Sequence, residues 1–279
     1  MNASLATACT MPDDSNAKIR PATRQSTPAS QQPSPGRTAD QGALDVGHTH
    51  PPARAATDAE VAQLINRIKS LTPVSTTGRG RLVFAMDATM SREPTWDLAL
   101  GLQADMFKAV KAVGGLDVQL VYFRGADECR ASKWVSDPDA LARLMTTVGC
   151  MGGHTQIGRV LGHVRGETET KRVNAVVYVG DAMEESIDDV AARAGEVGLL
   201  GVPVFAFQEG VDPTAERAYR EIARLTKGAY CRFDAGSAKQ LRDLLSAVAV
   251  YAAGGRNALE QLSHAHDGAG ARLLLGQMK

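Results

Sequence analysis

Short apolar runs alternate with amphipathic stretches between residues 81 and 253, and this alternation predicts a regular succession of strands and helices. The apolar runs with the length of buried strands are 82–86, 117–123, 173–179, 202–207 and 229–233, with 131–135 as a short edge strand. The amphipathic stretches predicted to be helices are 94–110, 138–145, 156–165, 187–200, 213–226 and 237–253. Strands that alternate with helices of this length indicate a mainly parallel sheet with helices on both faces.

The segments on either side of residues 80–254 have a different character. Residues 1–56 are rich in Pro, Ser, Thr and Gln and contain no aromatic residue, so we expect a disordered tail. Thr57 and Glu60 have the spacing of a capping box, which predicts a short helix and a linker at 57–79. Residues 255–279 lack aromatics and contain several Gly and His, which predicts a flexible C-terminal tail.

Composition and charge exclude several classes of partner. Lys+Arg and Asp+Glu are both 31, and this balance gives no electrostatic reason to expect nucleic acid or an anionic membrane as a partner. No apolar segment approaches the ~20 residues of a membrane span. The N-terminal residues lack the basic start and apolar core of a secretion signal. The four cysteines are scattered, as is typical of reduced thiols. We therefore expect a cytoplasmic protein.

Oxygen-bearing side chains gather where predicted strands end. Asp87, Thr89 and Ser91 follow the strand at 82–86, Thr155 follows a Gly pair, and Asp181 follows the strand at 173–179. Because loops after parallel strands emerge at one edge of a sheet, these residues can converge. Two carboxylates and three hydroxyls form an incomplete octahedron of the kind that Mg²⁺ completes with water or with an oxygen from another molecule. The sequence therefore predicts a magnesium site at this edge, with Mn²⁺ and Ca²⁺ as alternative ions.

The same residues carry a resemblance to a known family. Asp87-Ala-Thr89-Met-Ser91, Thr155 and Asp181 resemble the metal-ion-dependent adhesion site (MIDAS) of von Willebrand factor type A (VWA) domains, whose first motif is Asp-x-Ser-x-Ser. Thr89 in place of Ser, and Ala182 where the family often has Gly, are departures. The resemblance covers residues 80–254 and implies a doubly wound, Rossmann-like α/β fold. It also implies a Mg²⁺-dependent protein-interaction module in which an Asp or Glu of a protein partner completes the metal coordination.

Each candidate residue also has an ordinary structural interpretation. Asp87 or Ser91 could cap the helix that follows them, and Thr155 could cap the helix beginning at Gln156. Asp181 could form an Asx-turn. Two further acidic residues, Glu184 and Glu185, are either a rim around the metal or the solvated start of the next helix.

Two other functions compete with the interaction module. Asp87 after a buried strand also fits the nucleophile of a Mg²⁺-dependent aspartyl-phosphate phosphatase of the haloacid dehalogenase type. Such an enzyme needs a lysine and an acidic pair near the metal, but Lys171 precedes its strand and Asp188-Asp189 falls inside a helix. We therefore expect a protein without enzymatic activity. The third possibility is a VWA scaffold that binds no metal.

Overall fold

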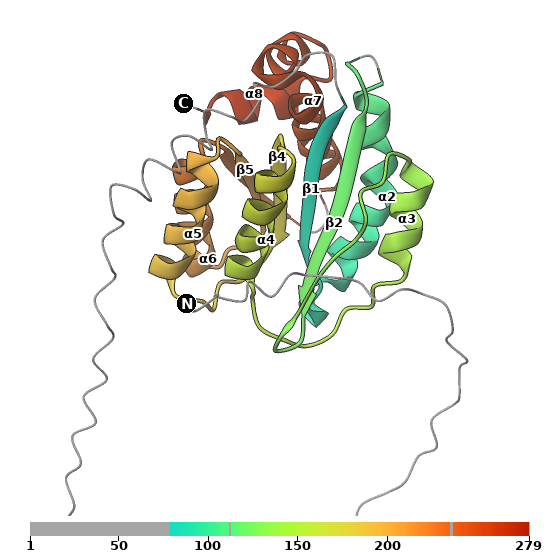
Figure 1. Cartoon of the computed structure of the whole chain (residues 1–279). Helices are drawn as coiled ribbons and strands as arrows, with labels where there is room; N and C mark the ends of the chain where they lie inside the picture. The colour runs from blue at the N-terminus through green and yellow to red at the C-terminus, as the bar shows by residue number, and fades with distance from the viewer. Residues whose placement is uncertain (1–78, 112, 235–236, 279) are drawn as a thin grey trace, which may run out of the picture. The chain divides into compact units, whose positions relative to one another are not determined.

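In a computed structural model of the 279-residue chain, the described residues are 79–111, 113–234 and 237–278. The expected tail at 1–56 and the expected helix and linker at 57–79 therefore lie outside the described part, apart from Arg79. The described part contains a six-stranded sheet with the order β3-β2-β1-β4-β5-β6 (Figure 1). The strands are β1 (Gly80–Asp87), β2 (Leu116–Arg124), β3 (Glu128–Ala131), β4 (Ala175–Gly180), β5 (Val204–Glu209) and β6 (Ala229–Phe233).

The sheet is parallel except at one edge. β1, β2, β4, β5 and β6 run in the same direction, and β3 pairs antiparallel with β2. The edge strand was expected at 131–135, but the structure places it earlier and leaves only an isolated bridge between Val118 and Val135. The mainly parallel α/β sheet predicted from the sequence is confirmed.

Helices cover both faces of the sheet, which makes it doubly wound (Figure 1). A short 3-10 helix, η1 (Met90–Arg92), precedes the first of them. The α-helices are α2 (Glu93–Ala109), α3 (Pro138–Thr146), α4 (Ile157–Thr170), α5 (Ile187–Leu199), α6 (Pro213–Thr226), α7 (Ala238–Ser263) and α8 (Ala269–Leu275). Side chains alternate along each strand. Phe84 belongs to the apolar core that includes residues of α2, α3, α7 and α8, while its neighbour Ala85 belongs to the core that includes residues of α4, α5 and α6.

The order of the strands creates a switch point between β1 and β4. From β1 the chain first adds β2 and β3 on one side, and then returns to place β4 on the other side. Ligands of open α/β sheets bind at the carboxyl ends of the strands beside such a point. Met86 pairs with Val179, so the carboxyl ends of β1 and β4 lie level with each other.

The C-terminal segment is ordered, so the expectation of a flexible tail at 255–279 is wrong for residues 255–278. α7 continues to Ser263 past a break in helical geometry at Gly255 (φ 69°), and α8 follows. Leu259 and Leu274 are fully buried in the core on the α2 and α7 face. The backbone N–H of Tyr230 on β6 donates to the side-chain Oε1 of Gln277 at 3.0 Å. Packing of its apolar residues orders this segment. The Gly and His content of the sequence had suggested a flexible tail instead.

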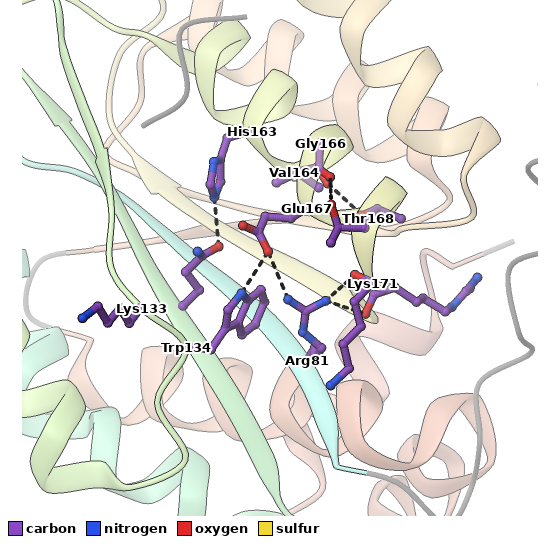
Figure 2. A network of polar contacts seen from close by, with 12 residues as sticks. Arg81, Lys133, Trp134, His163, Val164, Gly166, Glu167, Thr168 and Lys171 are labelled. Carbon is purple, nitrogen blue, oxygen red and sulfur yellow. Dashed lines mark hydrogen bonds and ion pairs between the residues drawn. The ribbon is translucent and has the colours of Figure 1, made fainter. Parts of the chain in front are cut away.

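A polar cluster fixes α4 against the amino end of β1 (Figure 2). The guanidinium of Arg81 donates to Glu167 Oε2 at 3.0 Å and to the backbone carbonyl of Lys171. It also lies 3.8 Å from the centre of the Trp134 ring, and Trp134 Nε1 donates to the same Glu167 oxygen at 2.9 Å. Arg81 is almost wholly buried, and its charge is paired with that of Glu167. We therefore interpret this cluster as structural.

Two further findings concern the described helices and the cysteines. Among the described helices, none has the length and apolar character required to cross a membrane. Cys150 and Cys231 carry free thiols, whereas Cys129 is disulfide-bonded, so the expectation of reduced thiols is correct for the first two and wrong for the third. The cytoplasmic location stays a prediction.

Candidate functional site

Asp87 and Asp181 meet at the carboxyl edge of the sheet, beside the switch point. Asp87 is the last residue of β1, and Asp181 directly follows β4. Asp87 is 1% exposed. The pKa of Asp87 is raised to about 6, chiefly by burial and to a smaller extent by the nearby charge of Asp181, while hydrogen bonds from Thr89 and the charge of Arg92 oppose the rise. A buried carboxylate beside a second carboxylate is a place where a cation is favoured.

A chain of hydrogen bonds joins these two carboxylates through Thr89 and Ser91. The backbone N–H of Thr89 donates to Asp87 Oδ1 at 2.8 Å, and the hydroxyl of Ser91 donates to Asp181 Oδ2 at 2.8 Å. The hydroxyl oxygens of Thr89 and Ser91 are 3.3 Å apart. Because Ser91 gives its proton to Asp181, Thr89 is the donor to Ser91. The structure thus brings four of the predicted residues together.

Thr155 is held on the neighbouring loop by Glu184. The backbone N–H of Thr155 donates to Glu184 Oε2 at 3.0 Å, and the backbone N–H of Glu184 donates to Thr155 Oγ1 at 3.0 Å. Within the described residues, Thr155 makes no hydrogen bond to the other predicted ligands. The pair ties the loop before α4 to the loop after β4, which is the loop that begins with Asp181.

Glu184 and Glu185 have a role that neither sequence interpretation foresaw. They precede α5, which is capped by Ser186, and they bind the start of α4 instead. The carboxylate of Glu185 accepts from the backbone N–H groups of Ile157 at 2.5 Å and Gly158 at 2.9 Å. It therefore satisfies the helix terminus that Thr155 was considered to cap.

Close backbone contacts position the loop that carries Thr155. Met151 N–H donates to the carbonyl of Ala88 at 2.9 Å, and His154 N–H donates to the carbonyl of Gly125 at 3.1 Å. A Cβ atom on Gly153 would lie 2.2 Å from the backbone nitrogen of Gly125, so only glycine permits this approach. The nearby thiol of Cys150 has its pKa raised by burial, which disfavours the reactive thiolate.

Arg92 is a member of this site that the sequence interpretation missed. Its side chain is 2% exposed, and its Nη1 lies 3.9 Å from Asp181 Oδ2 and contacts Glu209 Oε2. Its Nε and Nη2 are buried and have no hydrogen-bond partner among the described residues. The sequence contained a signal for the burial of Arg92, because its spacing places it on the same helical face as the buried residues of α2. These residues are Thr95, Trp96, Ala99, Leu102, Gln103 and Met106.

The donor set matches the preference of a hard divalent cation. All of its atoms are oxygens, and Asp181 Oδ1 is buried without a hydrogen-bond partner in the described part of the chain. Nowhere in that part do three or more His, Cys, Asp or Glu side chains form a metal-binding group. This site offers two carboxylates with hydroxyls, so a cation here would need water or a foreign oxygen as well.

The helix caps and the Asx-turn at Asp181 considered above find no support in the described residues, whereas Asp87 makes an Asx-turn contact with the backbone N–H of Thr89. The N-caps of η1 and α2 are Thr89 and Arg92, and neither makes a side-chain capping bond. No backbone N–H in this part of the chain donates to Asp181, so it forms no Asx-turn. Neither Asp87 nor Ser91 caps a helix.

The lysine considered for a phosphatase lies at the wrong end of the sheet. Lys171 ends α4 and contacts Arg81 near the start of β1 (Figure 2). Arg81 and Asp87 are six residues apart on one strand, which corresponds to about 20 Å. Asp188 and Asp189 lie in the first turn of α5, as expected. The lysine and the acidic pair considered for an aspartyl-phosphate enzyme are therefore not gathered around Asp87.

Comparison with known proteins gives matches only among solved structures. No model of a protein family matches the chain, and no curated protein matches it. One solved structure, an aerotolerance-related membrane protein from Bacteroides fragilis, shares 19% identity at a TM-score of 0.45, over 60% of this chain and 96% of that chain. The SpRpn10 VWA domain shares 11% identity at a TM-score of 0.46, over 60% of this chain and 92% of that chain.

A third match has a metal in its name. Proximal thread matrix protein 1 from the mussel byssus, with a zinc-occupied MIDAS motif, shares 16% identity at a TM-score of 0.46. The match covers 63% of this chain and 47% of that chain, so this chain spans about half of that protein. At such scores and identities the matches establish no family and no function for this chain. Its fold assignment rests on its own strand order and helix layers.

Proposed function

We propose that the chain is a VWA-like protein-interaction module whose contact with its partner depends on Mg²⁺ at Asp87, Thr89, Ser91, Thr155 and Asp181. The observation that carries the proposal is the hydrogen-bonded chain from Asp87 to Asp181, which ends at the buried and unpartnered Asp181 Oδ1. Leaving such an atom unpaired is costly unless a ligand satisfies it.

The side chains have separate tasks in this mechanism. Mg²⁺, or Mn²⁺ or Ca²⁺ in its place, supplies the positive charge that attracts a carboxylate of the partner. Asp87 and Asp181 would provide the negative charge that holds the cation, and the burial of Asp87 would strengthen that attraction. The hydroxyls of Thr89 and Ser91 are oriented by the carboxylates and by each other. Glu184 holds the Thr155 loop in place. An Asp or Glu of the partner fills the open position.

Exposed apolar side chains on the same edge indicate the rest of the partner surface. Met90 is 60% exposed and sits between two proposed ligands, and Met151 is 45% exposed on the loop before α4. Val211 is 73% exposed on the loop that follows β5. We call these three residues the apolar rim. The rim favours a partner whose acidic side chain is flanked by apolar residues, since both kinds of contact then form at once.

The alternative functions have less support. A phosphatase would need a cation other than Lys171 beside Asp87, and the buried Arg92, whose charge acts on Asp87, already contacts Glu209. A scaffold without metal would leave the desolvation of Asp87 offset only in part, because its pKa stays raised to about 6 despite the charge of Arg92 and the hydrogen bonds from Thr89. The balanced net charge supports a protein partner rather than nucleic acid or a membrane, in a cytoplasmic setting.

Calorimetric titration of the full chain with MgCl₂, MnCl₂ and CaCl₂ tests the metal. Wild type is expected to bind, and Asp87→Asn and Asp181→Asn are expected not to bind. Asp188→Asn, which removes an exposed carboxylate on α5, is the matched control and should bind like wild type. Equal binding by all four proteins would refute the site.

A pull-down from native extract, run with Mg²⁺ and with chelator, tests the interaction. The partner should be retained with Mg²⁺, released by chelator, and absent when Asp87→Asn is the bait. A partner retained in chelator would point to the metal-free scaffold.

A further inference from the structure

Arg92 places a fixed positive charge where a metal ion would act. Its Nη1 lies 3.9 Å from Asp181 Oδ2, on the oxygen that also accepts from Ser91. The same nitrogen contacts Glu209, the last residue of β5. The guanidinium is thus shared between the carboxyl ends of β4 and β5.

The pairing of Arg92 is incomplete. Nε and Nη2 are buried without partners among the described residues, although a guanidinium can donate five hydrogen bonds. The Glu209 oxygen that contacts Arg92 also accepts from the hydroxyl of Thr95. Arg92 therefore divides one nitrogen between two carboxylates, whereas a bidentate pair would use two. The contact with Asp181 is the longer of the two and is the one available to break.

The charges around Arg92 match a divalent cation. With Asp87, Asp181 and Glu209 ionised and Arg92 positive, the net charge of these groups is −2. Arg92 offsets Glu209 and leaves the pair of aspartates for the ion. Its nearness to Asp181 nevertheless opposes a cation at that carboxylate, because like charges repel.

We infer that Arg92 is an internal competitor for Asp181, which holds this carboxylate in the metal-free chain and moves to Glu209 alone when a divalent cation binds. The inference rests on the proposed function, and it adds the residue that sets the affinity for the cation. Arg92 is a positioning residue, because it acts through Asp181 and Glu209.

Two variants, expected to change the affinity for Mg²⁺ in opposite directions, test the inference. The double variant Arg92→Met with Glu209→Gln keeps the net charge at −2 but removes the competitor, so it should bind Mg²⁺ about tenfold more tightly than wild type. Glu209→Gln alone leaves Arg92 with Asp181 as its sole ionic partner, so it should bind about tenfold more weakly. Titration calorimetry of the full chain with MgCl₂ measures both.

The outcome of these titrations is decisive in both directions. If the double variant, folded by circular dichroism, binds no more tightly than wild type, Arg92 does not compete. If Glu209→Gln binds as tightly as wild type or more tightly, the shared guanidinium is likewise refuted. Matching shifts in opposite directions support the competitor.

A measurement without metal separates failure of the inference from failure of the proposed function. In chelator, a double-mutant cycle between Arg92→Met and Asp181→Asn in urea unfolding should reveal a favourable coupling. If no variant binds Mg²⁺ but the coupling is present, the proposed function fails and the hold of Arg92 on Asp181 stands. If wild type binds Mg²⁺ and the coupling is zero, the inference fails alone.

Discussion

Two buried arginines stand near the opposite ends of β1 and are treated very differently. At the amino end, Arg81 donates to Glu167 and to the carbonyls of Lys171 and Arg172, and it stacks on Trp134 (Figure 2). Beyond the carboxyl end, Arg92 reaches two carboxylates with one nitrogen and leaves two others unpaired. Both arginine side chains are buried, but only Arg92 has buried guanidinium nitrogens without a hydrogen-bond partner in the described part of the chain.

This difference separates the part of the fold that provides stability from the part that keeps polar groups available. A buried charge that is fully paired fixes the structure around it, whereas a half-paired one marks a place where a further ligand is expected. In an α/β sheet that place is the carboxyl edge, because the loops there are free to carry function. Substitutions near either end of β1 test this difference.

Arg81→Met should have the largest effect. It leaves Glu167 without its cation in a half-buried position, and we expect a loss of about 3–5 kcal/mol in the free energy of unfolding, with cation binding unchanged in the molecules that remain folded. Urea unfolding followed by circular dichroism measures this loss of free energy. Glu167→Gln, which retains an acceptor for Trp134, is the milder control. A loss below about 1 kcal/mol for Arg81→Met would contradict the structural role given to Arg81.

Asp87→Asn should stabilise the protein in chelator at neutral pH. A folded pKa near 6 in place of 3.8 means that the folded state holds its proton more tightly than the unfolded state. Stability of wild type should therefore fall as the pH rises from about 4 to 6, by up to about 3 kcal/mol. The Asn variant should lack this fall and exceed wild type above pH 6. Unfolding curves between pH 4 and 8 measure it, and identical pH profiles would contradict the raised pKa of the buried carboxylate.

Glu185→Ala should cost about 1–2 kcal/mol, because two backbone N–H groups of α4 lose their acceptor. Hydrogen exchange should accelerate at Ile157 and Gly158 before it does elsewhere in α4. Asp139→Ala, in the first turn of α3, removes an exposed carboxylate and should cost less than about 0.5 kcal/mol. Equal costs for the two variants would show that Glu185 acts only through the helix dipole.

Substitution of the apolar rim should have the smallest effect on stability. Met90→Ser and Met151→Ser change exposed side chains, so the free energy of unfolding should stay within about 0.5 kcal/mol of wild type. Retention of the partner in the Mg²⁺-dependent pull-down should nevertheless fall several-fold. Leu273→Ser, at an exposed apolar residue of α8 outside the rim, is the control. Full retention by both rim variants would confine the interface to the metal.

The prediction of the elements was accurate where local signals mark both ends. The helix at 213–226 and the strand at 229–233 were predicted with the bounds that the structure shows. Asp212 caps the helix, Pro213 opens it and Lys227, with φ 56°, ends it before Gly228. Each of these signals acts within a few residues, so the sequence displays it directly.

The long-range parts of the site could not be obtained in this way. The bonds between Thr155 and Glu184 join residues 29 positions apart, and nothing local marks Glu184 as an anchor for another helix. Arg92 was overlooked because a charged residue at the start of a helix is ordinary, although its spacing to the buried face of α2 was visible. The C-terminal error had a similar cause, since Ala271, Leu274, Leu275 and Met278 already show a helical spacing that the glycines masked.

The bond between Gln277 and β6 has a consequence for self-association. β6 is one of the two outer strands of the sheet, and an uncovered outer strand can pair with another chain. Gln277 occupies the N–H of Tyr230, and α8 packs beside β6, so the C-terminal segment protects this edge. Removal of residues 264–279 should expose it and produce dimers or aggregates, measurable by sedimentation velocity. The segment expected to be a loose tail is then the part that keeps one sheet from joining the next.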